Sequence, residues 1–170
     1  MGEELLFPYL IASGVIIGVG ATVAMDVWAL LLRRFFGIAA LNYALVGRWL
    51  AYIPRGIFRH DNISTAKPFA TELLIGWVAH YLTGIIFALT LIEFIGNDWL
   101  IEPSVIPAIA FGLLTVGFPF FLMQPGMGLG VAAAKTPKPN VARLRSITTH
   151  LVFGLGLYLS AMISALFVNQ

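Results

Sequence analysis

Four long apolar runs alternate with shorter polar segments along the chain, and this pattern predicts four helices that cross a membrane. A helix rises about 1.5 Å per residue, so about 20 apolar residues are needed to cross a hydrocarbon core of ~30 Å. The runs are continuous rather than alternating, which favours helices over the strands of a membrane barrel. We predict membrane-spanning helices over residues 5–34, 70–95, 104–124 and 146–168.

A shorter amphipathic segment lies between the first two runs. Leu41, Leu45, Trp49 and Tyr52 recur at helical spacing, and Pro54 follows them. Apolar residues at this spacing cover one face of a helix, and a proline ends it. We predict a helix over residues 41–53 that lies in the cytoplasmic interface or packs against the bundle. The predicted fold class is an all-α, integral membrane bundle of four transmembrane helices with a short cytoplasmic interfacial helix, forming a single domain over residues 1–170.

The composition excludes several classes of soluble protein. Of the 170 residues, 59% are hydrophobic and only 11% are charged, whereas a soluble domain is about 25% charged. A net charge of +2 on so apolar a chain gives no reason to expect a nucleic-acid partner. The expected partner is the lipid bilayer, with other membrane proteins or a second copy of the chain as further partners. The sequence contains no cysteine, which excludes disulfides and thiolate metal sites.

The basic residues predict how the chain is oriented in the membrane. All ten lie in the segments that connect the first helix to the second and the third to the fourth. The remaining connection and the start of the chain carry acidic groups only. Basic loops stay on the cytoplasmic side of a membrane. We therefore predict that both long loops are cytoplasmic and that both termini are on the outer side.

Four polar side chains in the cytoplasmic half of the predicted spans are candidate ligand-binding residues: Asp26, His80, Gln124 and His150. Polar groups are costly in lipid, so each of them is a functional hypothesis. Asp26, His80 and His150 each continue a row of small residues spaced four apart, which lets helices approach closely. We expect these faces to meet in the bundle interior. A cytoplasmic rim could support the site, and it consists of Glu72, Arg55, Arg59, His60, Arg143 and Arg145.

Several interpretations of this polar cluster remain open. Asp26 could pair with His80 and only fix the packing of the helices. The cluster could bind or pass an ion, a proton or a small solute. His80 and His150 could hold haem b, since ligation by two imidazoles needs no cysteine. The protein could also be an accessory or assembly subunit without catalytic activity.

An enzymatic role is less well supported by the sequence. An enzyme acting on lipid phosphates could use the arginine-rich loops and His60, but the chain lacks paired acidic metal ligands at a recognised spacing. A zinc site is disfavoured for the same reason, because no helix carries two histidines or a suitable carboxylate pair. The motif Ala134-Lys135-Thr136 resembles the end of a phosphate-binding loop, but it lacks the glycine required before the lysine.

The connection between the third and fourth helices has an unusual sequence. Pro119 predicts a kink in the third helix, and Gln124-Pro125-Gly126 predicts its end. Residues 126–134 are rich in glycine and alanine and too apolar for a free loop. We predict that they form a small-residue helix or a re-entrant segment packed on protein.

Six short motifs cover much of the chain. They are residues 25–34 (MDVWALLLRR), 41–50 (LNYALVGRWL), 54–60 (PRGIFRH), 119–125 (PFFLMQP), 136–139 (TPKP) and 143–150 (RLRSITTH). In these motifs the chain resembles an uncharacterised family of small bacterial inner-membrane proteins, a domain of unknown function. The resemblance implies a four-helix protein of the bacterial inner membrane and no particular activity. Its recurrent positions include Asp26, His60, Gln124 and His150.

Overall fold

The computed structural model describes residues 3–168, with side chains described for residues 7–166. All regular elements in this part of the chain are helical, which confirms the predicted fold class. Three spans are single helices: α1 (Glu3–Phe36), α3 (Glu72–Ile95) and α6 (Pro139–Val168). The third span is divided into α4 (Val105–Leu114), the π-helical turn η4 (Pro119–Met123) and α5 (Gln124–Gly126). Each of the four spans is long and apolar enough to cross a membrane.

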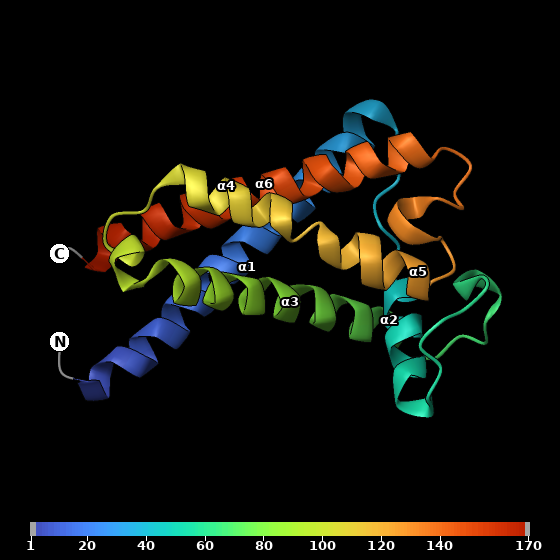
Figure 1. Ribbon diagram of the computed structural model, residues 1–170, viewed down its shortest axis with the longest axis horizontal. Helices are drawn as coiled ribbons and strands as arrows, with labels where there is room; N and C mark the ends of the chain where they lie inside the picture. Colours follow the sequence, from blue (N-terminus) through green and yellow to red (C-terminus); the bar gives the residue numbers. More distant parts are fainter. Residues whose placement is uncertain (1–2, 169–170) are drawn as a thin grey trace.

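Figure 1 shows α4 and α6 on one side of the bundle, α3 on the other, and α1 running obliquely past both. Accordingly α1 packs against α3 and α6, and α4 packs against α6. In contrast, α3 and α4 touch only slightly. The start of α1 and the end of α6 lie at one end of the bundle. The segments 33–71 and 127–145, which hold all the basic residues, lie at the other, and we call this the basic end.

Small residues let the spans approach closely, as their spacing predicts. A Cβ atom added to Gly84 of α3 would lie 2.0 Å from Thr22 Oγ1 of α1. A Cβ atom added to Gly112 of α4 would lie 2.5 Å from the Cα atom of Gly154 of α6. Neither site has room for a larger side chain, because real Cβ atoms do not come so close to their neighbours. These crossings fix which helix faces point inward.

Helix α2 (Tyr43–Tyr52) corresponds to the predicted interfacial helix and runs crosswise to the spans at the basic end (Figure 1). Its N-cap is Asn42, whose side chain accepts a hydrogen bond from the Ala44 N–H. The short turn η1 (Ile53–Arg55), which contains Pro54, follows it. The further turns η2 (Ile63–Thr65) and η3 (Asn97–Leu100) precede and follow α3.

The third span breaks earlier than Pro119 alone predicts. The α-helix ends at Leu114, and a turn at Thr115 leads into the π-helical η4. Proline has no N–H to donate to the carbonyl four residues earlier, so the regular ladder cannot continue through position 119. The next turn is wider, and the Gln124 N–H donates to the Pro119 carbonyl five residues back. A π turn rotates the residues after it by roughly 100° relative to a regular helix.

Residues 127–138 form packed turns rather than the predicted small-residue helix. They contain only the 3-10 turn η5 (Val131–Ala133), and Ala132 and Ala133 both have positive φ. Met127 and Ala133 are nevertheless buried, so the segment is packed on protein as expected. Helix α6 then begins at Pro139, before the predicted residue 146, because its polar first turns extend beyond the apolar run. Proline is well suited to the first turn of a helix.

Candidate functional site

A cavity of about 520 Å³ lies at the basic end, between α1, α3, the η4–α5 part of the third span, and α6. The chain from Ile38 to Tyr43 and part of α2 also line it. Three of the four predicted site residues line the cavity: His80, Gln124 and His150. The fourth, Asp26, does not line it but bonds to His80. The structure therefore brings the predicted residues into one region, with Asp26 set back from the cavity itself.

On the α3 side of the cavity, His80 belongs to a polar network with Asp26 and two tyrosines. Its Nε2 atom lies 3.1 Å from Asp26 Oδ1 and 2.9 Å from the Tyr43 hydroxyl oxygen. The Tyr81 hydroxyl donates to Asp26 Oδ2 at 2.8 Å. When Nε2 carries a proton, both oxygens of the carboxylate accept hydrogen bonds. The half-buried Asp26 carboxylate then has its charge stabilised by hydrogen bonds.

The hydrogen bonds of the His80 network depend on the tautomer of the imidazole. Nε2 bonds to Asp26 only when it carries a proton, and it accepts from the Tyr43 hydroxyl only when it does not. Burial, and then the charge of the neighbouring Asp26, raise the pKa of the Tyr43 phenol above its ordinary value. The phenol therefore stays protonated and available as a donor. His80 Nε2 therefore bonds to Asp26 in one tautomer and accepts from Tyr43 in the other.

On the α6 side of the cavity, His150 is held by one ring nitrogen. Its Nδ1 atom lies 2.8 Å from Thr115 Oγ1, and that hydroxyl donates its only hydrogen to the Gly112 carbonyl at 2.6 Å. Nδ1 must therefore be the donor in its bond to Thr115. In the neutral ring, Nε2 then carries a lone pair. The described part of the chain provides no hydrogen bond to this nitrogen.

Gln124 lies next to His150 in the cavity wall. Only 6% of its surface is exposed, and its Nε2 donates to Ser146 Oγ at 3.3 Å. Its Oε1 atom is buried without a hydrogen-bond partner among the described residues. The Ser146 hydroxyl can bond to either end of the amide, so one polar atom of the amide stays unpaired in both orientations. An unpaired amide atom at such depth is costly unless a ligand or water meets it.

The rest of the cavity wall is mainly apolar and in part aromatic. The ring centroid of Phe87 of α3 lies 6.1–6.3 Å from the ring centroids of Phe118, Phe111 and Phe153. Phe87, Phe118 and Phe153 all line the cavity. These rings bridge the seam where α3 and the third span hardly touch. The described residues provide no group of three or more His, Asp or Glu side chains able to hold a metal ion.

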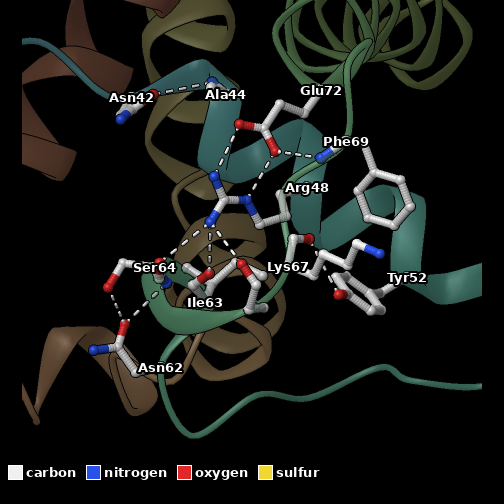
Figure 2. Close-up of polar contacts among 11 residues, drawn as sticks. Asn42, Ala44, Arg48, Tyr52, Asn62, Ile63, Ser64, Lys67, Phe69 and Glu72 are labelled. Atoms are coloured by element: carbon white, nitrogen blue, oxygen red, sulfur yellow. Dashed lines mark hydrogen bonds and ion pairs between the residues drawn. The ribbon is translucent and has the colours of Figure 1, made fainter.

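The predicted rim residues mostly lie outside the cavity. Glu72 forms a two-point ion pair with Arg48, with Nε–Oε2 and Nη2–Oε1 distances of 2.8 and 2.9 Å. Figure 2 shows the same guanidinium donating to backbone carbonyls of the 63–66 segment on its other side. Glu72 also accepts a hydrogen bond from the Phe69 N–H. Glu72 therefore anchors a loop to the start of α3.

The other rim residues have varied surroundings. The Arg55 guanidinium lies over the Phe69 ring, 4.6 Å from its centroid, and Arg59 is exposed. His60 packs edge-on against Tyr52, and its backbone N–H donates to the Gly126 carbonyl. Arg143 donates to the Ala132 carbonyl and to Asn140. Of the six predicted rim residues, Arg145 lines the cavity, where it donates to the Ala39 carbonyl.

Sequence reasoning did not identify four residues that organise this region: Arg48, Tyr43, Tyr81 and Thr115. Thr115 could have been found, because it is the only polar side chain between Ser104 and Gln124 in the third apolar run. Tyr81 directly follows a candidate histidine, but tyrosines are common near membrane surfaces and carry little information there. Tyr43 and Arg48 depend on how α2 crosses α3. That crossing is a tertiary feature without a local signal.

Comparisons with known proteins identify the family. The family model described as "Protein of unknown function (DUF2938)" matches residues 15–164. No curated protein and no solved structure matches the chain. The match confirms the resemblance to an uncharacterised family that the sequence motifs indicate. With nearly its whole length matched, the chain belongs to the DUF2938 family of proteins of unknown function.

Proposed function

We propose that the protein binds a small, membrane-soluble molecule in the cavity between α1, α3, the third span and α6. The observation that carries this proposal is the unpaired amide atom of the buried Gln124, beside the free Nε2 of His150. Ligand sites are typically apolar cavities of roughly 300–1,000 Å³ with a few convergent polar groups. The cavity of about 520 Å³ has this character.

The alternative roles are less well supported by the contacts. Haem b held by His80 and His150 would require His80 Nε2 to leave both Asp26 and Tyr43. A metal-ion site lacks a cluster of ligands among the described residues. A purely structural or accessory role predicts a polar cluster that satisfies itself. The Asp26–His80 network meets that description, but the Gln124 amide does not.

We further propose that the protein is a multi-pass protein of a bacterial inner membrane, with the basic end in the cytoplasm and both termini outside. All ten basic residues lie at one end of the bundle, which supports this orientation. The ligand cavity then opens in the cytoplasmic half of the membrane. A fluorescent-protein fusion at the C-terminus tests the orientation. The fluorescent protein is active only in the cytoplasm, so we expect the C-terminal fusion to be dark. A brightly fluorescent fusion would contradict the proposed topology.

Filling the cavity tests the proposed function. Thr149 lines the cavity, so Thr149→Phe should occupy part of it. Thr90→Phe is the matched control, because Thr90 lies on α3 outside the cavity and bonds only to its own helix. Each variant is purified in detergent, checked for folding by its melting temperature and extracted with organic solvent. Mass spectrometry then identifies the small molecules that co-purify.

We expect at least one compound to co-purify with the wild type and with Thr90→Phe, and to fall at least fivefold in Thr149→Phe. If no compound depends on the cavity while all three proteins are folded, the proposed function is wrong. If Thr149→Phe fails to fold, the smaller change Thr149→Leu replaces it with the same expectation.

A further inference from the structure

The α6 wall of the cavity requires a hydrogen-bond donor from its ligand. His150 gives its Nδ1 proton to Thr115, whose own hydrogen goes to the Gly112 carbonyl. The imidazole therefore offers the cavity only the lone pair of Nε2. A carbonyl oxygen placed there would meet another acceptor, whereas a hydroxyl would donate to it. The wall thus distinguishes an alcohol or phenol from the corresponding ketone or quinone.

Gln124 reinforces this wall at a neighbouring position. It bonds to Ser146, which lies one helical turn before His150 on the same face of α6. The Gln124 amide therefore contacts α6 one helical turn away from His150, and both residues line the cavity. A hydroxyl group both donates and accepts, so a single hydroxyl can bond to the imidazole and to either end of the amide. One ligand hydroxyl would satisfy both residues.

The charges around the cavity favour a neutral ligand. Asp26 is set back from the cavity and is hydrogen-bonded to His80 and Tyr81. Arg145, at the outer end, donates to the Ala39 carbonyl. A charged ligand would find no unpaired opposite charge deep in the cavity, and burying it there would be costly. The ligand should therefore carry hydroxyl groups and no ionised group.

The lining of the cavity favours an aromatic ring that carries polar groups. The side chains of Phe87, Phe118 and Phe153 pack together and line the cavity, as do His80 and His150. Aromatic side chains stack or pack edge-on with a flat ligand. His80, on α3, provides the second polar wall, where the imidazole and the Tyr43 hydroxyl can donate or accept a hydrogen bond. A ring with hydroxyls at opposite ends would contact both walls.

From these contacts we infer that the ligand is a lipid-soluble hydroquinone, bound in its reduced form with one hydroxyl donating to His150 Nε2. This inference rests on the proposed function and specifies its ligand. The second hydroxyl bonds to the His80 wall, and the ring lies among the phenylalanines. An apolar tail on the ring would lie along the remaining apolar lining. The binding step involves no electron transfer.

Three related probes test the inference on the full-length protein in detergent without oxygen. They are decylubiquinol, decylubiquinone, and the dimethyl ether of decylubiquinol, which keeps the ring and tail but has no hydroxyl to donate. Trp49 lines the cavity, so quenching of tryptophan fluorescence reports binding. We expect the quinol to bind at least tenfold more tightly than either of the other two probes.

Two variants test whether His150 causes the preference for the quinol. His150→Phe keeps a ring but removes the acceptor, so the preference for the quinol should fall below threefold. Thr90→Val, on α3 outside the cavity, should keep the wild-type preference. If His150→Phe does not fold, the comparison of the three probes on the wild type decides alone. Equal or weaker binding of the quinol, or a preference unchanged in folded His150→Phe, overturns the inference.

The co-purification experiment separates this failure from that of the proposed function. If another cavity-dependent compound co-purifies while the quinol shows no preference, the proposed function stands and the hydroquinone is wrong. If no cavity-dependent compound co-purifies and no probe shows saturable binding, both are wrong.

Discussion

The joint between α2 and α3 and the α6 wall of the cavity both contain polar side chains at the basic end, but they use them differently. At the joint, Arg48 donates to both oxygens of Glu72 and to carbonyls of the 63–66 segment. At the cavity wall, Gln124 keeps one amide atom unpaired, and His150 uses one of its two ring nitrogens. The Arg48–Glu72 pair uses its polar atoms in internal hydrogen bonds, whereas Gln124 and His150 each keep one polar atom without a partner among the described residues.

Packing shows the same contrast. A Cβ atom on Gly47 of α2 would lie 1.8 Å from the Glu72 carbonyl oxygen, so the two helices touch through their backbones. Around His150 the helices instead leave a cavity of about 520 Å³. A region that only holds the fold together gains from closing every gap and pairing every polar group. The cavity wall departs from both requirements, and such departures are typical of binding sites.

The largest effect should come from adding a side-chain atom at the contact between α2 and α3. Gly47→Ala forces the two backbones apart, and we expect it to lower the free energy of unfolding by about 3 kcal/mol. Gly117→Ala is the control, because a Cβ atom there meets only the Phe121 ring at 3.8 Å. Thermal unfolding in detergent measures both variants. A Gly47→Ala protein as stable as the control would show that α2 is not packed as described.

Removing the charge at the joint should have the next largest effect. Arg48→Met removes the guanidinium that pairs with the Glu72 carboxylate and that donates to three carbonyls. Hydrogen bonds to charged groups are worth more than neutral ones, and we expect a loss of about 2 kcal/mol in unfolding free energy. Arg59→Met, at an exposed position, should leave stability unchanged. Equal melting temperatures for the two variants would mean that the ion pair is dispensable.

The sequence predicted the fold well because each span depends on local composition. Continuous apolar runs identified four spanning helices, and the spacing around Trp49 identified the crosswise helix α2. Residue depth and spacing also pointed to His80, Gln124 and His150, which line one cavity. Polar groups in apolar helices are conspicuous, so this part of the site could be found without a structure.

The partners of these residues could not be predicted. The pairing of Glu72 with Arg48 depends on α2 crossing α3 at two glycines, and the sequence assigned Glu72 to the rim of the site instead. The hydrogen bond from His150 to Thr115 depends on how closely α4 and α6 approach. The π turn before Gln124 turns that side chain toward the cavity, and one proline does not predict its register. These are tertiary features, set by contacts between distant segments.

At the cavity wall, removing a polar group should have little effect on stability. Gln124→Leu replaces an incompletely paired amide with an apolar side chain of similar size, so we expect the unfolding free energy to change by less than about 1 kcal/mol. Binding should respond instead, and we expect the cavity-dependent compound to fall at least fivefold in the extracts. This outcome is the reverse of that expected for Arg48→Met. A strongly destabilised Gln124→Leu protein would show that the amide is structural.

The smallest expected effect concerns the proton on His150. Thr115→Val removes the hydroxyl that accepts a hydrogen bond from the His150 Nδ1–H group. The ring can then shift toward the tautomer that carries its proton on Nε2. That form donates to the cavity and suits a quinone carbonyl. We therefore expect the preference for decylubiquinol over decylubiquinone to fall by roughly three- to fivefold. This change corresponds to less than about 1 kcal/mol of binding free energy. Thr115→Ser keeps the hydroxyl and should keep the preference.

The same fluorescence titration measures both variants, and ¹⁵N shifts of the His150 ring report the tautomer directly. If Thr115→Val and Thr115→Ser have equal preferences, the hydroxyl does not set the His150 tautomer, and its bond to His150 serves only to pack α4 against α6.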